Sequence, residues 1–187
     1  MMGKLKGGIL IEVVKFLRSR KEEARRLLRP ELHSYLEDRV LASSWYDEQD
    51  YFELLEAVAK LYDAPDGVDP WVLMGRTGAR SSLGSAYRSM VRVGDPETTL
   101  KQFPLLWEVR HDTGRARVAI DGPGEGRVWL RDYALVSHQI CKAIQGTITE
   151  LVHQSGARDI EVEKLQCRAA YAEACCWKLS WRFGNGP

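Results

Sequence analysis

Hydrophobic and polar residues recur along this chain in two different periods, and the change of period divides the sequence. Between residues 7 and 103, apolar residues return at intervals of three and four, which is the spacing of amphipathic helices. After that point, short segments alternate apolar and polar residues, which is the period of a half-buried strand. Helices followed by strands, with one more helix before the last two strands, indicate an α+β fold.

Capping residues mark where several of the predicted helices begin. Asp47 precedes an apolar stripe, and the pairs Asp69-Pro70 and Asp95-Pro96 each combine an N-cap with a proline in the first turn. Pro30 interrupts the first basic, amphipathic stretch. The helices are expected over residues 7–29, 30–41, 47–62, 71–91, 95–103 and 136–155.

The alternating segments predict an antiparallel sheet of about five strands. Gly-containing turns join the first three strands into a meander, and the helix over residues 136–155 crosses to a final hairpin. In the last strand, Cys175, Trp177, Leu179 and Trp181 share one apolar face that must be covered. The strands are expected over residues 106–111, 115–120, 127–133, 159–166 and 175–181.

Length and charge narrow the class of protein. A chain of 187 residues suits one domain, with a helical part over residues 1–70 and a ligand-binding type of α+β part over residues 71–182. The 27 basic and 26 acidic residues leave a net charge of +1, so we expect no nucleic-acid partner. No apolar run is long enough to span a membrane and no signal-peptide pattern is present, which predicts a cytoplasmic protein without membrane insertion.

Three of the four cysteines are expected to converge. Cys141 lies in the crossing helix, while Cys167 and Cys175 lie on the two strands of the final hairpin. With His138, three residues before Cys141, they would form a sulfur and nitrogen set suited to zinc. The alternative is three buried free thiols that pack as small hydrophobic groups, and this alternative is the expected one. Cys176 would face the opposite side of the strand.

Several motifs together resemble a known family. They are Gly75, Gly78 and Gly84 in the long helix, the following Asp95-Pro96-Glu97, and the cysteines spaced by 26 and then 8 residues. From about Trp71 to Trp181 the chain resembles the 4-vinyl-reductase family of small-molecule-binding domains. Its superfamily includes heme nitric-oxide-binding domains and vesicle-tethering (TRAPP) subunits. The resemblance implies a small-molecule site, and in aromatic-sensing members three cysteines and a glutamate hold zinc.

The N-terminal 70 residues look more like the heme nitric-oxide-binding branch, on the strength of Lys6-Gly7-Gly8-Ile9-Leu10 and Trp45-Tyr46-Asp47-Glu48. That branch has a proximal histidine on a helix and a Tyr-x-Ser-x-Arg motif. Here His111 falls in a predicted strand, and Tyr87-Arg88-Ser89 has its next arginine at Arg92. Heme is therefore not expected, and neither is any other obligatory cofactor, with zinc kept as a candidate.

No sequence motif of a hydrolase or of nucleophilic catalysis is present, so we expect a non-enzymatic domain. Glycines in a helix allow close approach of a neighbouring helix or of a ligand, and tryptophans line apolar cavities as well as cores. The expected function is a bacterial sensor domain for a small hydrophobic or aromatic ligand, acting as a homodimer. The alternatives are a ligand-free dimerising scaffold and, third, a heme-based gas sensor. The expected ligand-binding residues are Trp71, Gly75, Gly78, Trp107 and Trp129.

Overall fold

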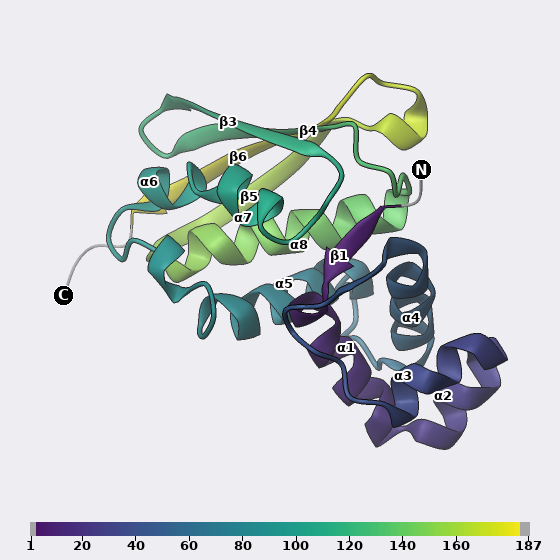
Figure 1. Ribbon diagram of the computed structural model, residues 1–187. Helices are drawn as coiled ribbons and strands as arrows, with labels where there is room; N and C mark the ends of the chain where they lie inside the picture. Colours follow the sequence, from purple (N-terminus) through teal and green to yellow (C-terminus); the bar gives the residue numbers. More distant parts are fainter. Residues whose placement is uncertain (1–2, 184–187) are drawn as a thin grey trace.

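The computed structural model describes residues 3–183 and shows two lobes (Figure 1). We call residues 3–61 the N-terminal lobe and residues 70–183 the sheet lobe. In the N-terminal lobe, helices surround a core of leucines and valines, and two short antiparallel strands run beside them. The elements of this lobe are β1 (Lys4–Lys6), α1 (Gly7–Ser19), α2 (Lys21–Leu27), the 3-10 helix η1 (Pro30–His33), α3 (Ser34–Glu37), β2 (Trp45–Asp47) and α4 (Glu48–Leu61).

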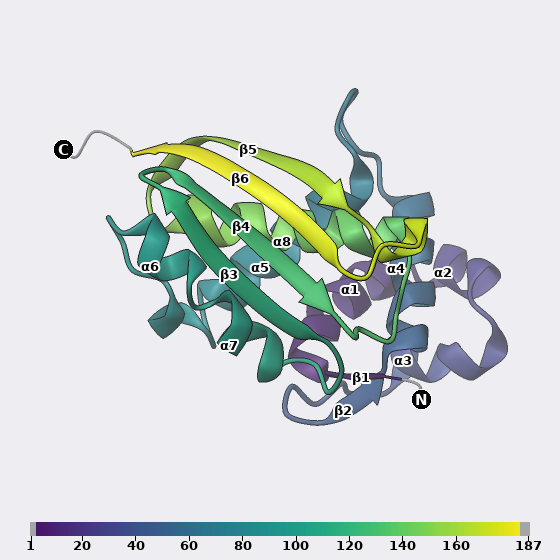
Figure 2. The ribbon, with the colours of Figure 1, turned by 90° about the horizontal axis from the view of Figure 1, so that it is seen from above.

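The sheet lobe stacks a four-stranded antiparallel sheet on α8, and α8 on α5 (Figures 1 and 2). The strand order is β3-β4-β6-β5, so the last strand of the chain lies inside the sheet. The elements are α5 (Pro70–Leu83), η2 (Arg88–Met90), α6 (Pro96–Leu100), α7 (Phe103–Glu108), β3 (Arg115–Gly122), β4 (Glu125–Arg131), α8 (His138–Gln154), β5 (Ala157–Gln166), η3 (Arg168–Ala170) and β6 (Cys175–Phe183).

The predicted α+β architecture is confirmed, including the helix that crosses to the final hairpin. The predicted caps form: Asp47 accepts a hydrogen bond from Gln49 N, Asp69 from Trp71 N and Val72 N, and Asp95 from Thr98 N. Each bond satisfies a helical N–H that has no partner inside its helix. In β6, Cys175, Trp177, Leu179 and Trp181 are all buried, as their alternation predicts.

The prediction of a strand over residues 106–111 was wrong, because α7 covers the first half of this segment and a turn follows. Phe103, Leu106 and Trp107 are buried, and their spacing of three and four is helical, while Pro104 stands in the first turn. The main sheet therefore has four strands, with β1 and β2 forming a separate pair. Residues 7–29, expected as one or two helices, form α1 and α2. The helix expected over residues 71–91 is shorter than predicted, because α5 ends at Leu83.

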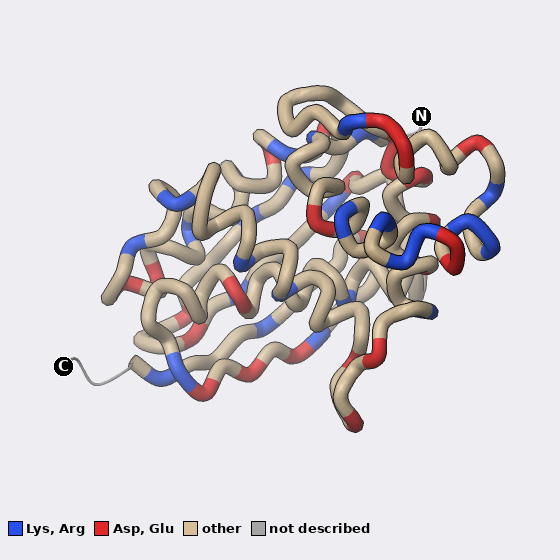
Figure 3. The backbone as a smooth tube through the Cα atoms, turned by 90° about the horizontal axis from the view of Figure 1, so that it is seen from below, with Lys and Arg blue, Asp and Glu red and all other residues tan. Residues whose placement is uncertain are grey.

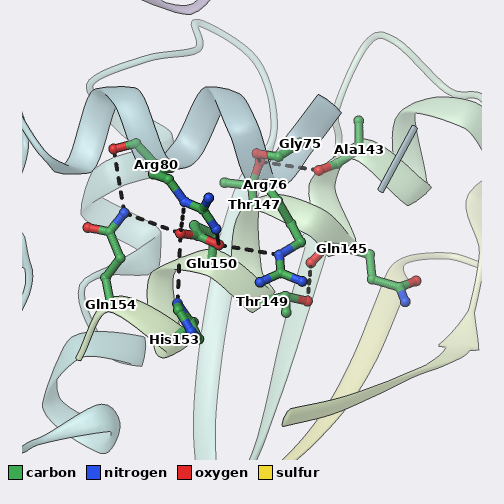
Figure 4. Close-up of polar contacts among 10 residues, drawn as sticks. All are labelled: Gly75, Arg76, Arg80, Ala143, Gln145, Thr147, Thr149, Glu150, His153 and Gln154. Carbon is green, nitrogen blue, oxygen red and sulfur yellow. Dashed lines mark hydrogen bonds and ion pairs between the residues drawn. The ribbon is translucent and has the colours of Figure 1, made fainter. Parts of the chain in front are cut away.

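A close crossing of α5 and α8 fixes the middle of the sheet lobe. A Cβ at Gly75 would lie 1.9 Å from Ala143 O, and one at Gly146 would lie 2.0 Å from Val72 O, so the two glycines allow the backbones to touch. Beside this contact, the buried carboxylate of Glu150 accepts hydrogen bonds from Arg80 Nε at 2.8 Å and Arg76 Nε at 3.3 Å (Figure 4). These contacts hold α5 against α8.

Surface charge is mixed in sign over the described residues. Figure 3 shows acidic and basic residues interspersed along the helices of the N-terminal lobe. Within the basic stretch, Lys21 and Arg25 both pair with Glu37, and Arg29 pairs with Asp50 and Glu53. No helix within residues 3–183 combines the length and the apolar composition that a membrane crossing requires.

Candidate functional site

A cavity of about 130 Å³ lies between the two lobes. The helices α1 and α4 supply one wall, and α5, α7 and α8 supply the other. Most of the lining is apolar, with a polar group of side chains gathered where the chain leaves α7. The lining residues include Val13, Leu55, Met74, Ile144, Gly75, Gly78, Trp107, Arg110, His111, Tyr51 and Tyr133. Such an enclosed apolar site with a few convergent polar groups is typical of a small-molecule site.

His111 is held in one orientation on the cavity wall. Its ring stacks on Trp107, with centroids 4.0 Å apart and planes 12° apart, and meets the edge of Tyr133. Its Nδ1 lies 2.9 Å from Glu48 Oε1, so the first residue of α4 reaches across from the other lobe. This contact leaves Nε2 as the ring nitrogen available to a ligand.

Burial sets the protonation states of this pair. Glu48 is 1% exposed, and burial raises its pKa to about 8. Burial, assisted by the nearby Arg110 guanidinium, lowers the pKa of His111 well below its usual value. At neutral pH the carboxyl therefore carries a proton and the imidazole is uncharged, so one neutral hydrogen bond joins them.

Arg110 places a positive charge on the same wall without an acidic partner. The side chain is 8% exposed, and its Nε has no hydrogen-bond partner within the described part of the chain. The guanidinium lies 5.6 Å from the ring centroid of Tyr87. Burial lowers the pKa of Arg110, and the nearby Tyr51 and Tyr87 raise it, which offsets part of the effect of burial.

The predicted ligand-binding residues divide between this cavity and other places. Gly75, Gly78 and Trp107 line it. Trp71 stacks on Phe52 at 5.9 Å and is not among the lining residues, so its part in ligand binding stays a prediction. Trp129 also lies outside this cavity, because strand alternation directs it away from the face that buries Val128 and Leu130, and toward Arg127. Its part in ligand binding stays a prediction as well.

Sequence reasoning missed Arg110, His111 and Glu48. A signal for two of them was present, because residues 103, 106, 107, 110 and 111 follow the helical spacing of three and four. That spacing places Arg110 and His111 on the buried side of the α7 segment. No local pattern pairs Glu48 with His111, which lies 63 residues later.

A second cluster forms where α8 meets the ends of β5 and β6. Cys141 Sγ lies 3.3 Å from Cys175 Sγ and 3.7 Å from Cys167 Sγ, and the three sulfurs all lie within 4.8 Å of one another. His138 Nδ1 lies 3.7 Å from Cys167 Sγ. The structure therefore brings together the three cysteines predicted to converge, with His138 at their edge. Cys176 is buried and stands outside the cluster.

The surroundings of the cluster favour negative charge on sulfur. A hydrogen bond from Cys141 and another from Arg168 N lower the pKa of Cys175 to about 5 and raise that of Cys141. Lys164 supplies a nearby cation whose Nζ is buried, has no hydrogen-bond partner among residues 3–183, and lies 3.4 Å from the ring centroid of Trp177. One thiolate at this site is therefore already stabilised at neutral pH.

The protein-family model described as "Protein of unknown function (DUF2378)" matches residues 21–182, which is most of the chain. The chain belongs to the DUF2378 family. Among curated proteins, no match to this DUF2378 member was found.

Solved structures of H-NOX proteins share the fold of this DUF2378 member. An Fe(II)NO H-NOX protein from S. oneidensis has a TM-score of 0.63 and 13% identity, with 94% of this chain and 98% of that chain covered. The unliganded Fe(II) H-NOX protein from K. algicida gives 0.65 and 12%, with 97% and 99% covered. A point mutant of T. Tengcongensis H-NOX gives 0.66 and 12%, with 97% and 100% covered. At such identities the likeness establishes the fold.

These matches correct one expectation and support others in part. The expectation against heme was wrong, because the matched structures include H-NOX proteins in Fe(II) states and a protein in which porphyrin distortion modulates the heme redox potential. It rested on placing His111 in a strand, whereas this residue follows α7 and lines the cavity. The resemblance to the 4-vinyl-reductase and tethering branches stays a prediction.

Proposed function

We propose that this DUF2378 member is a sensor domain that binds heme in the cavity between its lobes, with His111 as the axial ligand. The main support for this proposal is the contact between His111 Nδ1 and Glu48 Oε1, which leaves Nε2 available to a ligand. Histidines that bind metals commonly donate the N–H of their second nitrogen to a carboxylate, a carbonyl or water. The proposal therefore requires the tautomer in which Nδ1–H donates to a Glu48 oxygen and Nε2 carries the lone pair. The structural likeness to H-NOX proteins in Fe(II) states supports the same choice.

The side chains around the cavity fit heme in their chemistry. His111 offers an imidazole, the most frequent axial ligand of heme in globins and peroxidases. Arg110 offers a buried positive charge, and Val13, Leu55 and Ile144 offer apolar contacts. Bound heme would supply an iron that could bind a diatomic gas.

The cavity volume sets a condition on heme binding. A volume of about 130 Å³ is close to that of an engineered apolar cavity of roughly 150 Å³ that holds benzene. A porphyrin is much larger, so α1 and α4 must move away from α7 and α8 to admit it. The two lobes have largely separate cores, with Leu55 of α4 packed into the core of the sheet lobe. A movement at their boundary would therefore be less costly than one within either core.

Hemin titration tests the proposal. We expect the purified protein to take up about one hemin per chain with a shifted Soret band, and His111→Ala to lose that shift. His153→Ala is the matched control, because His153 is 41% exposed at its side chain and lies outside the cavity. No saturable Soret change would reject heme, while equal spectra for the two variants would reject His111 as the ligand.

A second candidate function is sensing of a small aromatic or hydrophobic ligand without heme. The volume of the cavity favours it, because a benzene-sized body fits the space without movement of the lobes. Gly78 offers a direct test, since a Cβ at this position meets nothing within 4 Å. Gly78→Leu is expected to fill the cavity and abolish binding of toluene measured by calorimetry. Unchanged toluene binding in Gly78→Leu would place the ligand elsewhere.

A ligand-free scaffold is less well supported, because a filled core would be expected between the lobes and a cavity is present there. Self-association as a homodimer and a cytoplasmic location stay predictions. Sedimentation of the purified protein at high concentration tests the first of these.

We also propose that Cys141, Cys167 and Cys175 bind zinc, with His138 as the fourth ligand. Tetrahedral thiolates at the usual Zn–S distance of about 2.3 Å stand roughly 3.8 Å apart. The sulfurs of Cys141 and Cys167, 3.7 Å apart, match this separation, and those of Cys141 and Cys175 are slightly closer at 3.3 Å. Lys164 offsets the charge of a three-thiolate zinc site, whose net charge would be negative.

Elemental analysis and one pair of variants test the zinc site. We expect about one zinc per chain in protein purified without chelator, lost in Cys167→Ser and kept in Cys176→Ser, whose sulfur stands outside the cluster. Less than about 0.1 zinc per chain in the wild-type protein would leave the thiols as buried packing groups.

A further inference from the structure

Arg110 places a buried positive charge on the cavity wall without a compensating negative charge beside it. Arginine is almost never fully buried unless it is paired, because removal of its charge from water is costly. Here the side chain is 8% exposed, and Nε has no partner in the described chain. The Tyr87 ring offsets part of this cost through a cation–π contact at 5.6 Å, but it brings no negative charge.

The acidic and phenolic groups near Arg110 do not neutralise it. Glu48 is engaged with His111, and its raised pKa keeps it protonated at neutral pH. Tyr51 stays neutral as well, because burial raises its pKa to about 12. Glu12, which also lines the cavity, is exposed enough to bind Lys15 at 2.9 Å. Among residues 3–183, no negatively charged group near Arg110 is therefore left to pair with it, which favours a ligand as the source of that charge.

The rest of the cavity defines the body of the missing partner. Val13, Leu55, Met74 and Ile144 line the space that opens from the Arg110 wall. They offer an apolar surface with no further cation among the lining residues. A ligand suited to this arrangement has one acidic end and an apolar remainder.

We infer that the ligand of this cavity is an apolar carboxylic acid, bound as its anion, with the carboxylate on the Arg110 guanidinium. The planar guanidinium pairs with a carboxylate through two parallel hydrogen bonds. The inference rests on the proposed function in one respect, namely that this cavity is the ligand site. It is independent of which acid occupies the cavity, since a small aromatic acid and the propionates of heme share this chemistry.

Paired ligands test the inference on the wild-type protein. Benzoate and benzamide have nearly the same shape and differ in charge, and hemin and its dimethyl ester form an equivalent pair at porphyrin size. We expect the acid of the pair that fits to bind about 10- to 100-fold more tightly than its neutral partner, as a charge-assisted hydrogen bond implies. The pair that binds identifies the size of the ligand.

Substitution of Arg110 provides the second readout. Arg110→Met keeps the length and apolar stem, so it is expected to abolish the preference for the acid. The same change is expected to raise the melting temperature of the ligand-free protein, because an unpaired buried charge is removed. A residue that served the fold alone would show the opposite shift.

The possible results distinguish a failure of the inference that Arg110 binds an acid from a failure of the proposal that this cavity is the ligand site. Equal affinity for acid and neutral ligand would overturn the inference and leave the cavity as a binding site. Binding of neither pair would overturn the cavity as a ligand site, and the inference with it. If Arg110→Met fails to fold, the wild-type comparison of acid and neutral ligand still decides.

Discussion

Alanine at two glycines of α5 should change stability in opposite directions. Gly75→Ala places a Cβ 1.9 Å from Ala143 O, about 1.5 Å short of an ordinary contact of 3.4 Å, and the obstacle is backbone that cannot rotate away. Overpacking of this kind costs roughly 1–3 kcal/mol, with a backbone clash at the upper end. The gain in helix propensity offsets about 1 kcal/mol. The net loss is therefore about 2 kcal/mol.

Gly78→Ala is the matched control, since its Cβ meets nothing within 4 Å. It keeps the propensity gain of up to about 1 kcal/mol without the clash. For a chain of this size, 1 kcal/mol moves the melting temperature by about 2–4 °C, so we expect a fall of about 4–8 °C for Gly75→Ala and a rise of about 2–4 °C for Gly78→Ala. Differential scanning calorimetry measures both. Shifts of the same sign would show that the α5–α8 crossing is not set by this glycine.

Three further predictions concern charge and metal. The pKa of Glu48 is raised to about 8 in the folded protein, so the folded state holds a proton that the unfolded state has lost, and stability should fall as the pH rises to 8 and then level off. Below pH 6.5, the ordinary pKa of histidine, the lowered pKa of His111 acts in the opposite direction, so the fall should begin near 6.5. Urea unfolding of Glu48→Gln should show a smaller fall. Glu150→Gln, which weakens the buried contacts to Arg76 and Arg80, should cost about 1–3 kcal/mol in urea unfolding, since both arginines reach solvent; a change below about 0.5 kcal/mol, on the same scale, would show that these contacts add nothing. Chelation with EDTA should lower the melting temperature of the wild-type protein but not of Cys167→Ser, and an equal response would refute the zinc site.

The sequence predicted elements whose signal is local. Asp47 and Asp69 cap helices where expected, and Trp177 is buried by the alternation of β6. The strands β1 and β2 escaped prediction because three residues are too few to show a period. The α7 segment was misassigned because its apolar residues were read in period two, although their spacing is helical.

The polar end of the candidate site lay beyond local patterns for a different reason. Glu48 and His111 meet through the contact between the two lobes, and burial, which sets both of their pKa values, is a property of the assembled fold. The cysteines were easier to place, because a helix and a hairpin bring Cys141 and Cys175 to one end of the sheet. The positions of these cysteines in the sequence were therefore enough to predict that they converge.

The strand β1 connects the ligand-facing segment to the start of the chain through backbone atoms. Lys6 N donates to Arg110 O at 2.9 Å, Asp112 N donates to Lys4 O at 3.0 Å, and Leu5 pairs with His111 as an isolated bridge. Displacement of Arg110 or His111 by a ligand would therefore pull β1, which leads directly into α1. Because amide groups transmit this movement, it tolerates most side-chain changes in β1. Lys6→Pro, which removes the N–H that donates to Arg110 O, is the substitution in β1 that would weaken the connection.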